Sequence, residues 1–186
     1  SRWDESFVPM RLADNLREVR LADGRPLVAA EEMLLPHRIA PEPGDPSTAW
    51  WPYALAGCAL AALPLVAAKR RPGLVAALAL PFWLACGLVG ALLLYLWTGT
   101  QHWAAWANHN LLLLDPLCLL LLPGGWMLSR GRRPGRMFAW TLSAVALLAI
   151  AALGLAWLQV RTQQNMRWIV LLLPLHLALF AALRRR

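Results

Sequence analysis

One stretch of the sequence gathers side chains that can carry protons within otherwise apolar surroundings. Residues 98–110 read TGTQHWAAWANHN and contain two His, two Asn, two Thr and one Gln. Four leucines later comes Asp115, the only acidic residue beyond Asp45. Imidazole and carboxyl groups can act as general acids and bases. The candidate catalytic residues are therefore His102, His109 and Asp115.

Other side chains near this stretch can hold a lipid headgroup or an ester. Asparagine amides donate hydrogen bonds to carbonyl oxygens, arginine pairs with phosphate, and tryptophan prefers the membrane interface. The candidate headgroup-binding residues are Asn108, Asn110, Arg161, Arg167, Trp103 and Trp106. Together these residues predict a polar site that orients a lipid at one face of a membrane.

A structural role explains several of the same residues. In this interpretation Asn108 and Asn110 cap the following helix, Asp115 tethers a loop, and the histidines lie among headgroups. A carboxylate near the centre of a membrane helix costs about 2.5–3.5 kcal/mol, so Asp115 should be protonated or paired. Its candidate partners are His102, His109, Arg161 and Arg167. The sequence leaves the catalytic and structural interpretations open.

The remaining polar groups favour structural roles. His176 lies beside Pro174 in an apolar run and should hydrogen-bond a carbonyl inside a helix bundle. A solvated loop is the expected setting of Gln159, Gln163, Gln164 and Asn165. Thiols in apolar runs behave as small hydrophobes, as expected of Cys58, Cys86 and Cys118. Two His seven residues apart plus one Asp match no metal-ligand spacing, so we expect no metal and no cofactor.

The elements that must position these groups are membrane helices. The chain has 186 residues, of which 59% are hydrophobic, and a mean hydropathy of +0.49, which excludes disordered and ordinary water-soluble classes. Crossing ~30 Å of hydrocarbon takes about 20 apolar residues. Five apolar runs approach this length: 50–68, 74–97, 111–128, 137–158 and 168–183. We therefore expect an all-α membrane domain with five transmembrane helices over residues 47–186.

Two details of these runs refine the expectation. Prolines, glycines and a carboxylate interrupt the third run, which should be bent. These residues are Asp115, Pro116, Pro123, Gly124 and Gly125. In the first run, Gly57 and Ala61 have the spacing that allows two helices to approach closely.

Residues 1–46 read as the C-terminal end of a periplasmic domain, followed by a proline-rich linker. A short amphipathic helix is expected from Phe7 to Arg17, then a hairpin around Asp23 and Gly24, which makes this part a small α/β remnant. Its few large apolar side chains cannot build an independent core. The sequence begins without a signal-peptide pattern, so we expect a further domain upstream.

The charges indicate the orientation in the membrane. Residues 1–46 carry a balance of −3 and residues 47–186 a balance of +11, within a total of +8. The basic excess therefore belongs to the membrane part and requires no nucleic-acid partner. Ten Lys and Arg fall on one side of the five spans and only Arg161 and Arg167 on the other. By the positive-inside rule, the N-terminus is outside, in a bacterial periplasm, and the C-terminus is cytoplasmic.

Two parts of the sequence resemble the Lnb-type bacterial proteins, long catalogued only through a domain of unknown function. Trp3–Leu12, with Pro26 and Leu27, resembles the closing segment of their periplasmic domain. Thr100–His102, Asn108–Leu112 and Asp115–Leu117 are similar to the motif at the outer edge of their five-span membrane domain.

This resemblance implies a lipoprotein N-acyltransferase of the bacterial inner membrane. Such an enzyme moves an acyl chain from the lipid on a lipoprotein's N-terminal cysteine to the amine of that cysteine. Its thiol and histidine belong to the upstream periplasmic domain, and none of Cys58, Cys86 or Cys118 matches them. The resemblance therefore implies a membrane domain that anchors this catalytic domain and presents lipid at the outer leaflet. Its partners would be membrane lipid, the lipoprotein substrate and the upstream domain.

Two alternatives remain. The five-helix domain can be a passive membrane anchor, with all chemistry upstream. It can also be a small transporter subunit, although solute pathways usually need more buried polar groups than Asp115 and His176.

The predicted orientation can be tested by labelling in intact spheroplasts. An impermeant thiol reagent should modify a cysteine introduced by Ala104→Cys, which is expected outside. It should not modify one introduced by Gly131→Cys, because this position lies between Arg130 and Arg132 in a loop expected in the cytoplasm. Modification at Gly131 but not at Ala104 would reverse the orientation and remove the shared outer compartment of the polar residues.

Overall fold

The computed structural model describes residues 9–32, 49–101, 106–158, 163 and 165–184. The chain separates into two compact units, Ser1–Pro46 and Ser47–Arg186, which are described separately. The predicted positions His102, Trp103, Arg161, Gln159 and Gln164 lie outside the described residues.

The first unit contains one short helix and a tight turn. Helix α1 spans Pro9–Glu18, close to the predicted amphipathic helix. Gly24 has φ +84°, as the predicted Asp-Gly turn requires. Arg20 and Pro26 form a single isolated antiparallel bridge, and residues 9–32 contain no strand. Backbone hydrogen bonds flank the bridge, from Leu21 N–H to the Arg25 carbonyl oxygen at 2.8 Å and from Leu27 N–H to the Val19 carbonyl oxygen at 3.0 Å, so the turn is paired over a few residues only in this described part.

An ion pair holds α1 to the segment after the turn. The guanidinium of Arg17 contacts Asp14 and Glu31, with Nε donating to Glu31 Oε2 at 2.6 Å. This hydrogen bond lowers the pKa of the Glu31 carboxyl group. All three side chains are exposed, so solvent screening keeps their contribution to stability small.

Helices are the regular secondary structure of the second unit where the structure describes it, and five of its segments are long and apolar enough to cross a membrane. These segments are Trp51–Lys69, Gly73–Thr98, His109–Ser129, Arg136–Trp157 and Met166–Leu183. They correspond to helices α2 (Trp51–Arg70), α3 (Pro72–Thr98), α5 (Arg136–Trp157) and α6 (Met166–Leu183), and to a composite third segment. The predicted all-α architecture with five spanning segments is confirmed.

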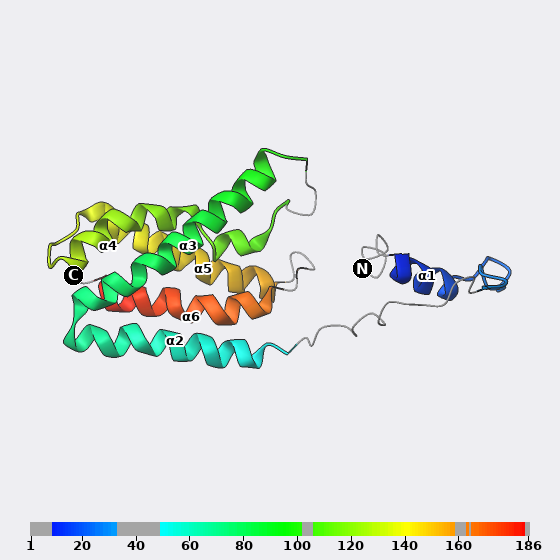
Figure 1. The fold of residues 1–186 in the computed structure, drawn as a ribbon, viewed down its shortest axis with the longest axis horizontal. Coiled ribbons are helices and arrows are strands. Elements are labelled where there is room, and N and C mark those ends of the chain that lie inside the picture. Colours follow the sequence, from blue (N-terminus) through cyan, green and yellow to red (C-terminus); the bar gives the residue numbers. More distant parts are fainter. Residues whose placement is uncertain (1–8, 33–48, 102–105, 159–162, 164, 185–186) are drawn as a thin grey trace. The chain divides into compact units, whose positions relative to one another are not determined.

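The helices alternate in direction between two ends of the bundle (Figure 1). The α2–α3 turn, the turn between α4 (Leu122–Ser129) and α5, and the end of α6 lie at one end. The end of α3, the start of the third segment, the end of α5 and the start of α6 lie at the other. We call the first the basic end, because its turns carry Lys69, Arg71, Arg130, Arg132, Arg133, Arg136 and Arg184. We call the second the polar end, because Asn108, His109, Gln163 and Asn165 lie there.

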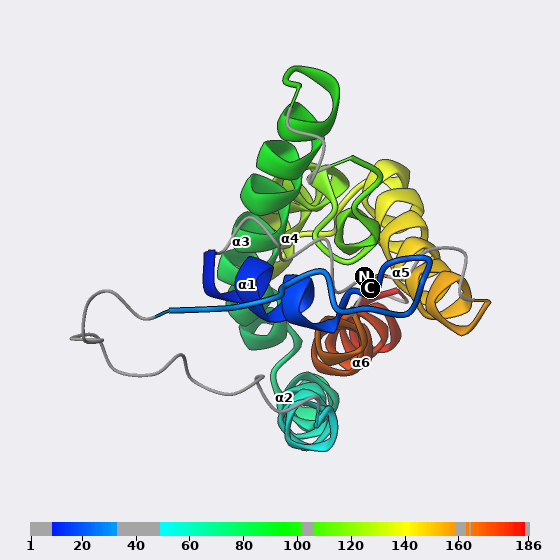
Figure 2. The ribbon, with the colours of Figure 1, turned by 90° about the vertical axis from the view of Figure 1, so that its right-hand side faces the viewer.

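Helix α6 lies between α2 and the rest of the bundle (Figure 2). Helix α2 packs mainly on α6, and α3 packs mainly on the third segment. A Cβ atom at Gly57 would lie 2.3 Å from the carbonyl oxygen of Val170 and 2.7 Å from that of Leu171. The close helix contact predicted for Gly57 and Ala61 is therefore present, and its partner is α6.

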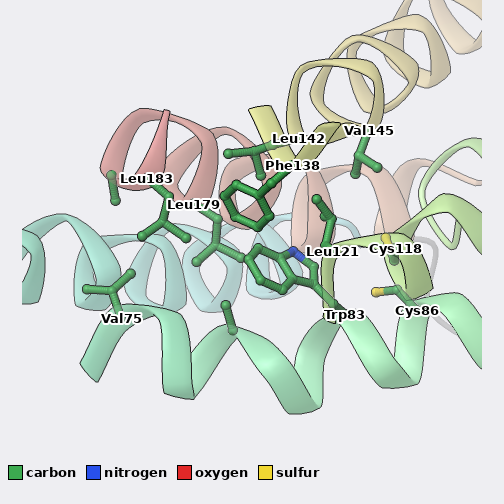
Figure 3. Close-up of a cluster of buried hydrophobic side chains, with 12 residues drawn as sticks. Val75, Trp83, Cys86, Cys118, Leu121, Phe138, Leu142, Val145, Leu179 and Leu183 are labelled. Carbon is green, nitrogen blue, oxygen red and sulfur yellow. The ribbon is translucent and has the colours of Figure 1, made fainter. Parts of the chain in front are cut away.

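The buried residues of the larger core cluster come from α3, α5, α6 and the part of the third segment at residues 116–121 (Figure 3). Trp83 and Phe138 pack edge to face, with ring centroids 5.9 Å apart. A Cβ atom at Gly124 would collide with Phe138, and one at Gly125 with Trp83. These glycines lie inside helix α4 (Leu122–Ser129) and make room for the two rings. The prediction that these two glycines bend the third segment is therefore wrong.

The bend lies about nine residues before these glycines, at Leu113–Asp115. A 3₁₀-helix, η3 (His109–Leu112), precedes it, and a second, η4 (Pro116–Leu121), leads into α4. Asp115 is extended, with φ −91° and ψ 129°, as expected of a residue before proline. A Cβ atom at Gly90 of α3 would lie 1.9 Å from the carbonyl oxygen of Leu114. Only glycine at position 90 allows the extended backbone to lie this close to α3.

The close approach at Gly90 predicts a sensitive position. Gly90→Ala should lower the free energy of unfolding in detergent by about 1–3 kcal/mol, and with it the melting temperature. The reason is that the added Cβ atom would overlap backbone atoms that cannot move away. Gly154→Ala is the matched control, since a Cβ atom there meets nothing within 4 Å. This control should melt at the same or a slightly higher temperature, because alanine favours helix. Equal melting temperatures for Gly90→Ala and the parent protein would contradict the packing described here.

Candidate functional site

The start of the third segment is capped by its own polar side chains. Asn108 precedes η3 in an extended conformation, and its Oδ1 accepts a hydrogen bond from the backbone N–H of Asn110 at 3.0 Å. This is the capping role that one interpretation of the sequence predicts for Asn108. The cap uses the carboxamide oxygen, so the amide N–H groups of Asn108 are the atoms that can face a lipid.

Gln163 joins the two connections of the polar end. Its Oε1 accepts from the backbone N–H of His109 at 2.9 Å and from Nδ2 of Asn165 at 2.9 Å. Its Nε2 donates to the carbonyl oxygen of Ala107 at 2.9 Å. Gln163 and Asn165 are half-buried, so the expected solvated loop is wrong for both residues. The error arises because 54 residues separate Gln163 from His109, and no local pattern shows the contact.

The same contact holds an uncommon backbone conformation. Ala107 has φ +49°, in the left-handed region that side chains with a Cβ atom rarely adopt. The hydrogen bond from Gln163 to its carbonyl oxygen helps to keep the backbone in this conformation. The approach to η3 is therefore set by tertiary contacts.

Two buried oxygen atoms of the third segment have no hydrogen-bond partner among the described residues. They are Oδ1 of Asn110 and Oδ2 of Asp115. A buried polar atom without a partner costs free energy, so native proteins keep few of them. Asn110 lies in η3 at the polar end, and Asp115 lies at the bend, deeper in the bundle. Each of the two residues thus keeps one side-chain oxygen atom free of a described partner.

Asp115 acts as a local cap. It is 6% exposed, and its Oδ1 accepts from the backbone N–H of Leu117 at 2.9 Å, at the start of η4. None of its expected partners pairs with it among the described residues. The Arg167 guanidinium lies 5.6 Å from the centre of the Tyr53 ring, and the backbone of His109 binds Gln163. Two of the four expected partners, His102 and Arg161, lie outside the described residues.

His176 supplies a hydrogen-bond donor to a backbone carbonyl group at the bend. Its side chain is 3% exposed, and Nε2–H donates to the carbonyl oxygen of Leu113 at 2.9 Å. The Phe82 ring lies against the imidazole, with centroids 5.0 Å apart. The expectation that His176 hydrogen-bonds a carbonyl inside the bundle is confirmed.

The three cysteines are free thiols, and two of them meet in the core. Cys86 of α3 and Cys118 of η4 are buried and lie close together in the same core cluster (Figure 3). Cys58 is exposed on α2. Among the described residues, no group of three His, Cys, Asp or Glu side chains could hold a metal ion.

The structure brings together part of the predicted site. Asn108, His109 and Asn110 are consecutive in the cap and in η3, and Trp106 is exposed just before them. Arg167 is half-buried near the start of α6. Gln163 is the connecting residue that sequence reasoning missed. His102, Trp103 and Arg161 lie outside the described residues.

Replacing His176 tests its role at the bend. His176→Leu should lower the free energy of unfolding in detergent by about 1–3 kcal/mol, because the buried carbonyl oxygen of Leu113 loses its hydrogen-bond donor. His176→Gln keeps an N–H donor of similar reach and should recover part of this loss. Equal stability of the leucine and glutamine variants would show that the hydrogen bond is not what holds the bend.

One comparison with known proteins identifies the membrane unit. The family model described as the Lnb transmembrane domain matches residues 50–186, which include all five spanning segments. No curated protein and no solved structure matches the chain. The match covers well over half of the chain and agrees with the five-segment architecture. This multi-pass membrane chain therefore belongs to the Lnb transmembrane domain family.

Proposed function

We propose that the chain is the membrane domain of a bacterial lipoprotein N-acyltransferase-like protein. In this proposal it anchors an upstream periplasmic catalytic domain and presents lipid to that domain at the outer leaflet of the inner membrane. The observation that carries the proposal is the buried Oδ1 atom of Asn110, which has no partner among the described residues in an otherwise hydrogen-bonded polar end. The chemistry itself would belong to the upstream domain.

The polar end has the chemistry to orient a lipid. A carboxamide offers one acceptor oxygen and two N–H donors, so Asn110 can bind an amine or an ester carbonyl of the lipidated cysteine. The N–H groups of Asn108 are available for a second ester oxygen, because its Oδ1 is engaged in the cap. His109, half-buried beside them, can carry a proton. Arg167 can offset the charge of a phosphate group.

Charge and aromatic residues support the orientation. The basic end carries the Lys and Arg residues that favour the cytoplasmic side, which leaves the polar end at the outer face. Exposed tryptophans occur toward both ends, as expected of residues that favour the two membrane interfaces. Those of the polar end are Trp50, Trp51, Trp97, Trp106, Trp157 and Trp168, and those of the basic end are Trp126 and Trp140.

The alternative is a passive anchor. The observation that favours it is that Asn108 and Asp115 each cap a 3₁₀-helix, so both side chains already have a structural role. Under this alternative, the unit only needs to hold the upstream domain at the membrane.

Substitution at the polar end tests lipid presentation. In the full-length protein, Asn110→Ala or His102→Ala should lower lipoprotein N-acylation about tenfold, since losing one hydrogen bond worth about 1.4 kcal/mol has that effect. The acyl state is measured by mass spectrometry of the lipoprotein's N-terminal peptide, and the membrane level by immunoblot. Thr98→Ala, at an exposed polar residue just before the same connection and outside the Thr100–His102 motif, is the matched control and should leave acylation unchanged.

The outcomes separate the two functions. Undiminished acylation in both alanine variants, at equal membrane levels, would remove the site hypothesis. Exchanging residues 50–186 for an unrelated membrane anchor distinguishes further: retained acylation favours the passive anchor, and lost acylation with a normal membrane level favours lipid presentation.

A further inference from the structure

Helices α2 and α3 leave an apolar groove between them on the side of the bundle away from α5. The two helices meet at the Arg71 corner and diverge toward the polar end, with α6 behind them (Figures 1 and 2). A cavity of about 210 Å³ lies in this groove. It is lined by Leu60, Leu63 and Pro64 of α2, by Val75, Leu78, Ala79 and Phe82 of α3, and by Leu175 and Leu179 of α6. Every lining residue is apolar.

A second cavity continues the groove toward the basic end. It measures about 530 Å³, and Leu63 lines both cavities. Its other lining residues are Ala62, Val66, Ala67, Arg71 and Leu74. Among the residues whose side chains the structure describes, Arg71 is the charged residue that lines the cavities, and it lies at the basic end of the groove. The groove therefore runs from an arginine at the basic end into purely apolar surroundings.

The length of the groove matches one leaflet of a bilayer. Leu60 lies eleven positions before Arg71, the residue that follows α2, and at about 1.5 Å per position this distance is about 16 Å. Half of a hydrocarbon core of about 30 Å is about 15 Å. A groove of this length, with an arginine at the membrane surface and Leu60 near the midplane, has the dimensions of a phospholipid acyl chain.

The basic side chains near the groove favour a lipid with an anionic headgroup. Lys69 and Arg71 flank the mouth, and Asp115, the only acidic residue of the membrane unit, lies in the interior beside η4. A juxtamembrane Lys or Arg attracts an anionic headgroup with about 1 kcal/mol. A phosphate group at Arg71 would place the attached glycerol and acyl chain directly in the groove.

We propose that the α2–α3 groove binds one anionic phospholipid of the leaflet at the basic end. One acyl chain lies along Leu63, Leu78 and Phe82, and the phosphate pairs with Arg71. The site is distinct from the polar end, which lies at the opposite end of the bundle, and it stands whether or not the polar end presents a lipid.

Photolabelling tests this site directly. The chain is reconstituted into nanodiscs that contain phosphatidylglycerol with a diazirine at the middle of an acyl chain. After irradiation, the labelled residues are mapped by mass spectrometry. We expect label concentrated on the facing residues of α2 and α3, well above that on Leu147 of α5, which is 66% exposed and lines neither cavity.

Two kinds of variant give the proposal its controls. Leu63→Trp fills the groove, and because Leu63 is 60% exposed the larger ring should not disturb the core. Label on α2 and α3 should then fall to the level on α5. Arg71→Gln should reduce the groove label about fivefold, the effect of losing about 1 kcal/mol of headgroup attraction. Leu147→Trp and Arg132→Gln are the matched controls and should leave the groove label unchanged.

Other results would overturn the proposal. Equal labelling of the groove and of α5 in the parent chain would mean that the lipid there is ordinary bilayer. Groove label unaffected by Leu63→Trp would mean that the cavity is not the binding site. Leu78→Trp fills the groove from the opposite wall and repeats the test if Leu63→Trp fails to fold.

Discussion

The bend at Leu113–Asp115 imposes the strictest physical requirement on this protein. A spanning segment that leaves the helical conformation exposes backbone N–H and C=O groups where no water can satisfy them, so the protein must supply the partners. His176 supplies a donor for the Leu113 carbonyl, Asp115 supplies an acceptor for the Leu117 N–H, and Gly90 allows the extended backbone to lie against α3. Helices α3 and α6 must therefore flank the third segment, which determines much of the packing order.

The bend also explains why the polar residues have divided roles. Above it, η3 carries Asn108, His109 and Asn110 at the end of the bundle, where they can meet lipid headgroups. Below it, the core closes around Trp83 and Phe138, and α4 turns toward the basic end. A continuous helix would have spread these residues around its circumference. The 3₁₀ geometry and the Gln163 contacts hold them instead on one short, ordered segment.

Local features of the sequence predicted much of this arrangement. Apolar run length predicted five spans, Asp115-Pro116 accounts for the bend, and the position of His176 in an apolar run predicted its hydrogen bond to a carbonyl. The failures concern contacts between distant segments. The partners proposed for Asp115 were chosen by their expected side of the membrane, whereas the bend turns Asp115 into the interior. Gln163 looked solvated because its partners, Ala107 and His109, come from another connection.

The sequence by itself determined the membrane class, the number of spans, the segregation of charge and the capping chemistry of Asn108, because each follows from composition or from neighbours within a few residues. Only the tertiary structure decided which helix each span packs against. It also decided that Gly124 and Gly125 accommodate rings instead of bending the chain, and that α2 and α3 diverge to form a groove. The physical reason is that packing depends on side-chain volumes from segments far apart in the chain, and such complementarity leaves no periodic signal.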